Sequence, residues 1–125
     1  MKTRIEDVNH SEPTFDRDGY PTEETLSTIR EWPIDALADT AAAMDFAGRA
    51  WAYPKCWECV EKWTDPDWSS HMMRVYRFST AGWSGNESIV EAIEANVMLQ
   101  TLGAWSWQRG GHYEYRFTIQ SDIKP

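Results

Sequence analysis

Two glycine-containing turns carry the polar residues of this chain that could do chemistry. The first, Gly82-Trp83-Ser84-Gly85-Asn86, stands between a strand-like segment and a helical pattern, and the second, Arg109-Gly110-Gly111-His112, comes after that helix. A serine beside a histidine can act as nucleophile and base, while free amides at a helix start favour an anion. If the turns meet in space, they form one ligand site. Its candidate residues are Trp83, Ser84, Gly85, Asn86, Arg109 and His112.

A structural explanation of the first turn competes with the chemical one. Ser84 and Glu87 have the spacing of a capping box, in which the serine hydroxyl accepts a hydrogen bond from the Glu87 amide and the carboxylate reaches back. The turn also resembles a nucleophile elbow, but position 86 is Asn rather than Gly, and the chain is too short for that hydrolase sheet. We therefore favour a binding role over an enzyme and assign no catalytic residue.

The chain has two cysteines, and they are three residues apart. Cys56 and Cys59 have the spacing of a redox motif or of half a zinc site. A structural zinc ion needs four ligands. His71 and His112 could complete the set, although nothing in their spacing requires it. Packing is the preferred interpretation of both thiols, and we predict no metal or other cofactor.

The charge of the chain is strongly acidic and unevenly distributed. The formal net charge is −8, and residues 1–50 carry eleven acids and five bases. Such a chain should not bind nucleic acid directly, because that binding depends on Lys and Arg neutralising phosphates. It suits instead a basic protein surface, including one that normally holds nucleic acid. The candidate partner-binding residues are Glu23, Glu24, Glu31, Asp35 and Asp39.

Length and hydropathy predict a single small domain without a membrane span. A chain of 125 residues fits one domain, and we expect an extended arm over residues 1–21, packed through Phe15 and Tyr20, followed by one α+β domain over 22–125. No apolar run is long enough to cross a bilayer. The first ten residues lack the apolar core of a signal peptide, so we expect a cytoplasmic location.

The N-terminal half predicts two helices. Thr22 is a typical N-cap, since Glu23 and Glu24 follow it in the first turn, and Pro33 should stop this helix. Asp35 is the predicted cap of the next helix, which ends before Tyr53-Pro54. The two helices are expected to form a hairpin. Residues 55–71 fit either strand alternation or a helical turn, and both interpretations stay open.

The C-terminal half predicts strand, helix, strand and strand. The helix after the first glycine turn buries Ile89, Val90, Ile93 and Val97, and Asn96 is a candidate left-handed stop. Trp105 and Trp107 should pair with the Tyr113 and Tyr115 face of the last strand. The expected class is α+β: an N-terminal helical hairpin followed by a β-α-β-β unit with a small three-stranded, mainly antiparallel sheet. One face is covered by the third helix, and the N-terminal helices are available to cover the other.

Three segments resemble a family of short, uncharacterised proteins of tailed bacteriophages and prophages. The segments are Gly19-Tyr-Pro-Thr-Glu-Glu-Thr-Leu26, Gly82-Trp-Ser-Gly-Asn-Glu87 and Arg109-Gly-Gly-His-Tyr113. The resemblance covers about residues 19–117, with poor agreement over 34–71, and the family often has a glycine where this chain has Ala81. It implies a phage origin and no mechanism. A phage origin favours a protein that binds and disables a host machine.

We therefore expect a non-enzymatic phage accessory protein in the host cytoplasm. Its acidic helices would bind a host protein with a basic surface, as anti-defence and anti-CRISPR inhibitors do. One alternative is a small-ligand or nucleotide-binding protein, or an enzyme, that uses the two glycine turns. Another is a minor virion or assembly component. The oligomeric state stays open.

Overall fold

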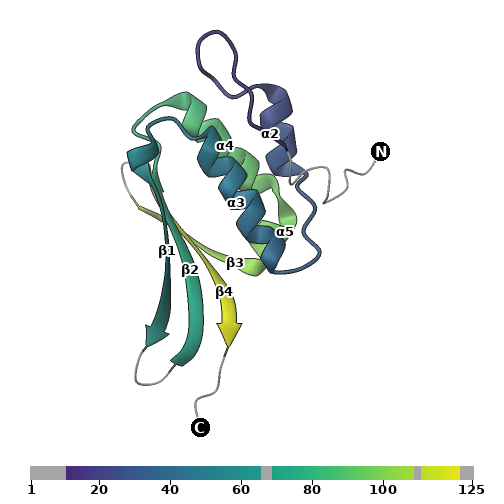
Figure 1. Ribbon diagram of the computed structural model, residues 1–125. Helices are drawn as coiled ribbons and strands as arrows, with labels where there is room; N and C mark the ends of the chain where they lie inside the picture. Colours follow the sequence, from purple (N-terminus) through teal and green to yellow (C-terminus); the bar gives the residue numbers. More distant parts are fainter. Residues whose placement is uncertain (1–10, 66–68, 109–110, 122–125) are drawn as a thin grey trace.

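The computed structural model describes residues 11–65, 69–108 and 111–121, which form the expected α+β fold (Figure 1). Two helices come first, and a short 3-10 helix leads into the sheet. The elements are α2 (Glu23–Arg30), α3 (Ala38–Ala50), η1 (Pro54–Cys56), β1 (Trp57–Asp65), β2 (Ser69–Ser79), α4 (Ser84–Ala95), α5 (Val97–Leu102), β3 (Gly103–Gln108) and β4 (His112–Ser121). None of the helices in these ranges is long and apolar enough to cross a membrane.

The sheet has four antiparallel strands in the order β1-β2-β4-β3. The three strands expected from the sequence are β2, β3 and β4, and the segment left open between strand and helix supplies β1. Pairing with β2 makes this segment a strand rather than a helical turn. In this pairing Trp57 lies opposite Phe78 and Cys59 lies opposite Tyr76. The predicted hairpin register is confirmed, with Trp105 opposite Tyr115 and Trp107 opposite Tyr113.

One hydrophobic core lies between the sheet and the four α-helices. Tyr76, Phe78, Tyr115 and Phe117 share one face of the sheet and are at most 3% exposed. They pack in one cluster with buried side chains of α2, α3, α4 and α5, and Figure 1 shows these helices gathered on that side. The idea that the N-terminal helices cover the opposite face is therefore wrong. That face carries charged side chains, which would be costly to bury under a helix.

The helix starts partly follow the predicted capping residues. Thr22 caps α2 as expected, since its hydroxyl accepts a hydrogen bond from the Thr25 amide. The Asp35 cap is wrong, because the N-cap of α3 is Leu37 and makes no side-chain cap bond. Instead, the Asp39 carboxylate reaches back and accepts from the amides of Asp35 and Ala36, both at 2.9 Å. An acid in the first turn of α3 thus binds two amides of the segment that precedes the helix.

Asn96 separates α4 from α5 in a way that the sequence pattern did not predict. The expected left-handed stop is wrong, since Asn96 is extended, with φ −81° and ψ 102°. Its buried side chain accepts from the Leu99 amide and donates to the carbonyls of Ile29 and Trp32. The resulting break turns Val97 outward to 72% exposure, so its predicted burial is also wrong.

Candidate functional site

The two glycine turns meet at one end of the sheet. Ser79, the last residue of β2, pairs with His112, the first residue of β4. The next amide, that of Thr80, donates to the Gly111 carbonyl at 3.0 Å. Gly111 has φ +76°, and a Cβ there would lie 2.4 Å from the Thr80 hydroxyl oxygen, so only glycine fits this approach. Arg109 lies outside the described residues.

Two side chains of the first turn, those of Trp83 and Ser84, contact Tyr20 of the N-terminal segment. The Trp83 ring stacks on Tyr20 with centroids 4.8 Å apart. A Cβ on Gly85 would lie 2.3 Å from the same indole, so the ring rests directly on the helix backbone. Ser84 Oγ lies 3.4 Å from the Tyr20 hydroxyl. Tyr20 thus packs as expected of the arm, whereas Phe15 is 47% exposed.

The predicted capping box at Ser84 is wrong. Trp83 is the N-cap of α4 and makes no side-chain cap bond, while Ser84 is already the first helical residue. The Glu87 amide donates to the Trp83 carbonyl instead of to the Ser84 hydroxyl. The spacing of a capping box was present in the sequence, but the helix starts one residue too early to use it.

Asn86 is a buried structural link between two chain segments. Its side chain is fully buried. The amide oxygen accepts from the Ala52 amide at 2.9 Å, and Nδ2 donates to the carbonyls of Ala52 and Thr80 at 3.1 and 3.4 Å. A buried amide with partners for both its oxygen and its nitrogen is satisfied and has little left to offer a ligand. Asn86 therefore fixes the α3–η1 link against the end of β2.

An open pocket of about 330 Å³ lies at this end of the molecule, where η1, β1, β2 and β4 come together. His112 lines it, whereas Trp83, Ser84, Gly85 and Asn86 do not. The structure therefore brings the two turns together without forming one cavity from the candidate side chains that it describes. The residues that line the pocket are Lys55, Cys56, Glu58, Arg77, Phe78, Ser79, His112, Tyr113 and Glu114.

Three residues of the pocket lining belong to a row of alternating charges across the helix-free face of the sheet: Glu58, Arg77 and Glu114, with Arg116 extending the row beyond the pocket. Arg77 Nε donates to Glu114 Oε1 at 2.9 Å, and Arg77 Nη1 lies 3.8 Å from Glu58 Oε1. Arg116 Nε donates to the other oxygen of Glu114 at 2.7 Å. The hydrogen bond from Arg77 lowers the pKa of Glu114, and the same bond raises the pKa of Arg77. Sequence reasoning missed this row, because its members come from three strands.

The two cysteines do not form a redox pair in this arrangement. Cys59 lies in β1 opposite Tyr76 on the helix side of the sheet, whereas Cys56 ends η1 and lines the pocket. Three extended residues place their Cα atoms roughly 10 Å apart, beyond the reach of about 7 Å for a disulfide bond. Burial raises the pKa of the Cys59 thiol, which disfavours the reactive thiolate. No cluster of three metal-ligating side chains occurs among the described residues, and the His71 side chain lies outside that set.

The negative charge of the described elements is concentrated in the helices. Four strands hold four acids and four bases: Glu58, Glu61, Asp65 and Glu114 against Lys62, Arg74, Arg77 and Arg116. Four helices hold seven acids and two bases: Glu23, Glu24, Asp39, Asp45, Glu87, Glu91 and Glu94 against Arg30 and Arg49. We call these helices the acidic helical layer. The sheet beneath this layer is balanced in charge.

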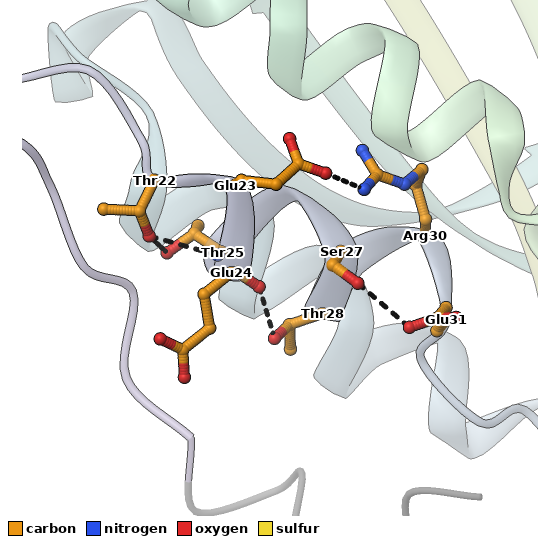
Figure 2. Close-up of polar contacts among 8 residues, drawn as sticks. All are labelled: Thr22, Glu23, Glu24, Thr25, Ser27, Thr28, Arg30 and Glu31. Atoms are coloured by element: carbon orange, nitrogen blue, oxygen red, sulfur yellow. Dashed lines mark hydrogen bonds and ion pairs between the residues drawn. The ribbon is translucent and has the colours of Figure 1, made fainter. Parts of the chain in front are cut away.

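Several acids of the layer lack a basic partner within the described part of the chain (Figure 2). Glu23 pairs with Arg30, and the Glu31 carboxylate accepts from the Ser27 hydroxyl at 2.9 Å. The Glu24 carboxylate, in contrast, makes no hydrogen bond or ion pair with the described residues and extends away from the helix in Figure 2. On α4, the acids expected on its solvent side are exposed and unpaired among the described residues: Glu87, Glu91 and Glu94. The layer therefore presents uncompensated negative charge to solvent.

Comparisons of this chain with protein-family models, with curated proteins and with solved structures found no match. The resemblance to short phage proteins accordingly stays a prediction.

Proposed function

We propose that this chain is a small acidic accessory protein that acts by binding a basic surface of another protein. The observation that supports this proposal best is the separation of charge between the acidic helical layer and the charge-balanced sheet. A net charge spread evenly over the surface would serve solubility alone. A charge gathered in one layer produces a field that orients an approaching cationic partner.

The exposed acids suit fast, salt-dependent association more than a large binding energy. Exposed ion pairs contribute little to affinity, but complementary potentials raise the association rate and exclude wrong partners. Glu24 and the acids of α4 keep their negative charge uncompensated by any described base. They are thus available to the cations of a partner. The candidate surface joins the predicted residues of α2 and of the α2–α3 link to three acids that the sequence prediction left out, Glu87, Glu91 and Glu94.

The partner we propose is a host protein that handles nucleic acid. Such proteins carry Lys and Arg where they contact phosphates, and an acidic layer is complementary to that surface. The resemblance to phage proteins supports this choice, since phage accessory proteins that disable defence systems act on such machines. The proposed mode of action is competition: the acidic helical layer occupies the surface that nucleic acid would otherwise contact.

Affinity purification from host lysate tests this proposal. The chain is used as bait at about 50 mM and about 500 mM salt, where the Debye length falls from roughly 14 Å to about 4 Å. We expect a partner that is retained at low salt and released at high salt. Saturating that partner with the chain should also reduce its binding to nucleic acid. Recovery of no partner at low salt would count decisively against the proposal.

A matched pair of variants distinguishes binding by the acidic helical layer from a general effect of net charge. Glu24→Gln with Glu31→Gln removes two charges from α2 and its C-terminal end, and Glu58→Gln with Glu61→Gln removes two from β1. Both variants have the same net charge. The first should reduce recovery of the partner and the second should leave it near the wild-type level. Equal effects of the two variants would mean that only net charge matters.

A further inference from the structure

We propose that the open pocket at the sheet end is a binding site for the anionic group of a small molecule, a phosphate or a carboxylate. This site is separate from the acidic helical layer and does not depend on the proposed function. It also differs from the ligand site expected from the two glycine turns, with which it shares only His112 among the described residues. Its donors are Lys55, Ser79 and His112.

The row of charges at the pocket has no net charge once Arg116, which does not itself line the pocket, is included. Glu58, Arg77, Glu114 and Arg116 alternate in sign along the row described above. Glu114 is engaged by two guanidinium groups, at 2.9 Å from Arg77 and 2.7 Å from Arg116. Its carboxylate is thereby neutralised locally and does not repel an anion as a free acid would. The ion pairs of the row link these side chains to one another.

The rim of the pocket supplies hydrogen-bond donors that no acid of the described residues engages, although Glu58 and Glu114 also line the pocket. Lys55 and His112 are exposed, and neither makes an ion pair with a carboxylate among the described residues. The Ser79 hydroxyl oxygen accepts from the Ala81 amide at 3.3 Å, which leaves its proton to be donated. An ammonium group, an imidazole and a hydroxyl group are together a donor set suited to a phosphate or carboxylate. This rim is positive on a chain whose net charge is −8.

Two of the three segments that carry the rim are held in uncommon backbone conformations. Tyr53, two residues before Lys55, has φ +62°, and Ala81, two residues after Ser79, has φ +53°. Left-handed conformations of residues other than glycine are energetically unfavourable, and they persist only where surrounding contacts impose them. Here Asn86 supplies those contacts, because it bonds to Ala52 on one side and to Thr80 on the other.

The rim is therefore preorganised by a buried amide. Asn86 fixes the spacing between the segment that carries Lys55 and the segment that carries Ser79, and β2–β4 pairing places His112 opposite Ser79. A site whose donors are fixed in advance loses less entropy on binding. The volume of about 330 Å³ admits a small phosphate ester or a carboxylic acid. Asn86 is a positioning residue in this proposal and does not touch the ligand.

Titration followed by NMR tests the site on the intact chain. Inorganic phosphate, acetate and phosphoserine are added separately at constant ionic strength set with chloride, and the His112 ring signals, assigned with a His112→Gln variant, are followed. We expect saturable shifts of these signals and of the Lys55 and Ser79 amides. Saturation by phosphate and phosphoserine alone assigns a phosphoryl group, and saturation by acetate as well assigns anions in general. No saturable shift with any of the three overturns the proposal.

Two variants that each remove one positive charge distinguish a specific site from general electrostatic attraction. Lys55→Gln should weaken binding at least about fivefold, because it removes the single full positive charge of the rim. Arg17→Gln removes one positive charge from the exposed turn near the N-terminus and should leave the affinity within about twofold of wild type. An equal loss in both variants would show general electrostatic attraction and no site. The amide spectra of both variants verify that they are folded.

Discussion

At the scale of single residues, the polar side chains of the first glycine turn differ sharply in what they do. Asn86 is fully buried and makes three hydrogen bonds to the backbone of other segments. Ser84 is exposed and has one long contact to a hydroxyl group. The two residues are two positions apart, and both were candidates for a ligand site. Burial and partners, which the sequence does not display, separate a structural link from a surface residue.

Replacing Asn86 by Ala should lower the free energy of unfolding by about 2 to 3 kcal/mol, because buried backbone groups of Ala52 and Thr80 lose their partners. The matched change Ser84→Ala should cost less than about 0.5 kcal/mol. Urea denaturation of both variants measures the difference. A cost of about 1 kcal/mol for Ser84→Ala would instead be the value expected of an N-cap, and it would contradict the helix start described above.

Glu114 should give stability that depends on pH. Its pKa is lowered in the folded protein by the hydrogen bond from Arg77. A carboxyl with a depressed folded pKa stabilises the fold above its unfolded value of about 4.3, and this stabilisation is lost as the pH falls through the folded pKa. Glu114→Gln should therefore be less stable than wild type at pH 7, and the gap should narrow below about pH 4.

Denaturation of both proteins across this range checks the prediction for Glu114, and NMR titration of the carboxyl carbon gives the pKa directly. In Arg77→Gln the pKa of Glu114 should move up toward its usual range, because the principal cause of the shift is removed. A gap between wild type and Glu114→Gln that stays constant from pH 7 to pH 3 would mean that the row of charges does not act as described.

At the scale of elements, aromatic rings resting on glycines hold helices to their neighbours. The Trp83 indole lies on Gly85 of α4, and the Trp57 indole lies on Gly48 of α3. A Cβ at either glycine would approach ring atoms to 2.3 or 2.4 Å. The Trp83 ring also stacks on Tyr20 and so links the N-terminal segment to α4. The Gly-Trp-Ser-Gly turn is thus explained by packing.

Gly85→Ala should displace the Trp83 ring and destabilise the protein by about 1 to 3 kcal/mol, since inserted atoms force a packed ring out of place. The near-ultraviolet circular dichroism of the stacked Tyr20 and Trp83 rings should weaken with it. Gly82→Ala is the matched control without a steric clash, because a Cβ at position 82 has no atom within 4 Å. It should leave the ring signal intact even though its φ of +74° adds backbone strain.

The elements themselves were largely predictable, and their ends were not. Strict alternation of apolar and polar residues from Tyr113 onward predicts β4 and its pairing with β3, because a repeat of two residues is typical of a β-strand. Residues 57–65 fitted two periods, and pairing with β2 decided between them. The Ser84 cap failed because the Trp83 carbonyl accepts from the Glu87 amide, and the Asp35 cap failed because α3 begins later, with Leu37 as its N-cap. Local spacing gives the candidates, and tertiary contacts select among them.

At the scale of the whole molecule, the excess of negative charge lies in the layer of helices. The four α-helices of the described residues pack on one face of the sheet, and they hold most of the acidic excess of the described elements. The sequence predicted the excess in the N-terminal half. It did not predict that α4 would lie beside those helices and add Glu87, Glu91 and Glu94 to the same layer. The pocket could likewise not be predicted from the sequence, because its lining comes from four elements that only the strand order of the sheet brings together.

Binding of a basic partner by the acidic helical layer is tested most directly by the rate at which the chain associates with a captured partner. Stopped-flow association is measured at several salt concentrations for wild type, for Glu87→Gln with Glu91→Gln and Glu94→Gln, and for Glu58→Gln with Glu61→Gln and Glu114→Gln. We predict that the wild-type rate falls steeply with salt, and that the α4 variant associates about tenfold more slowly at low salt while the sheet variant stays near wild type. Equal rates for the α4 and sheet variants, or a rate independent of salt, would contradict the account.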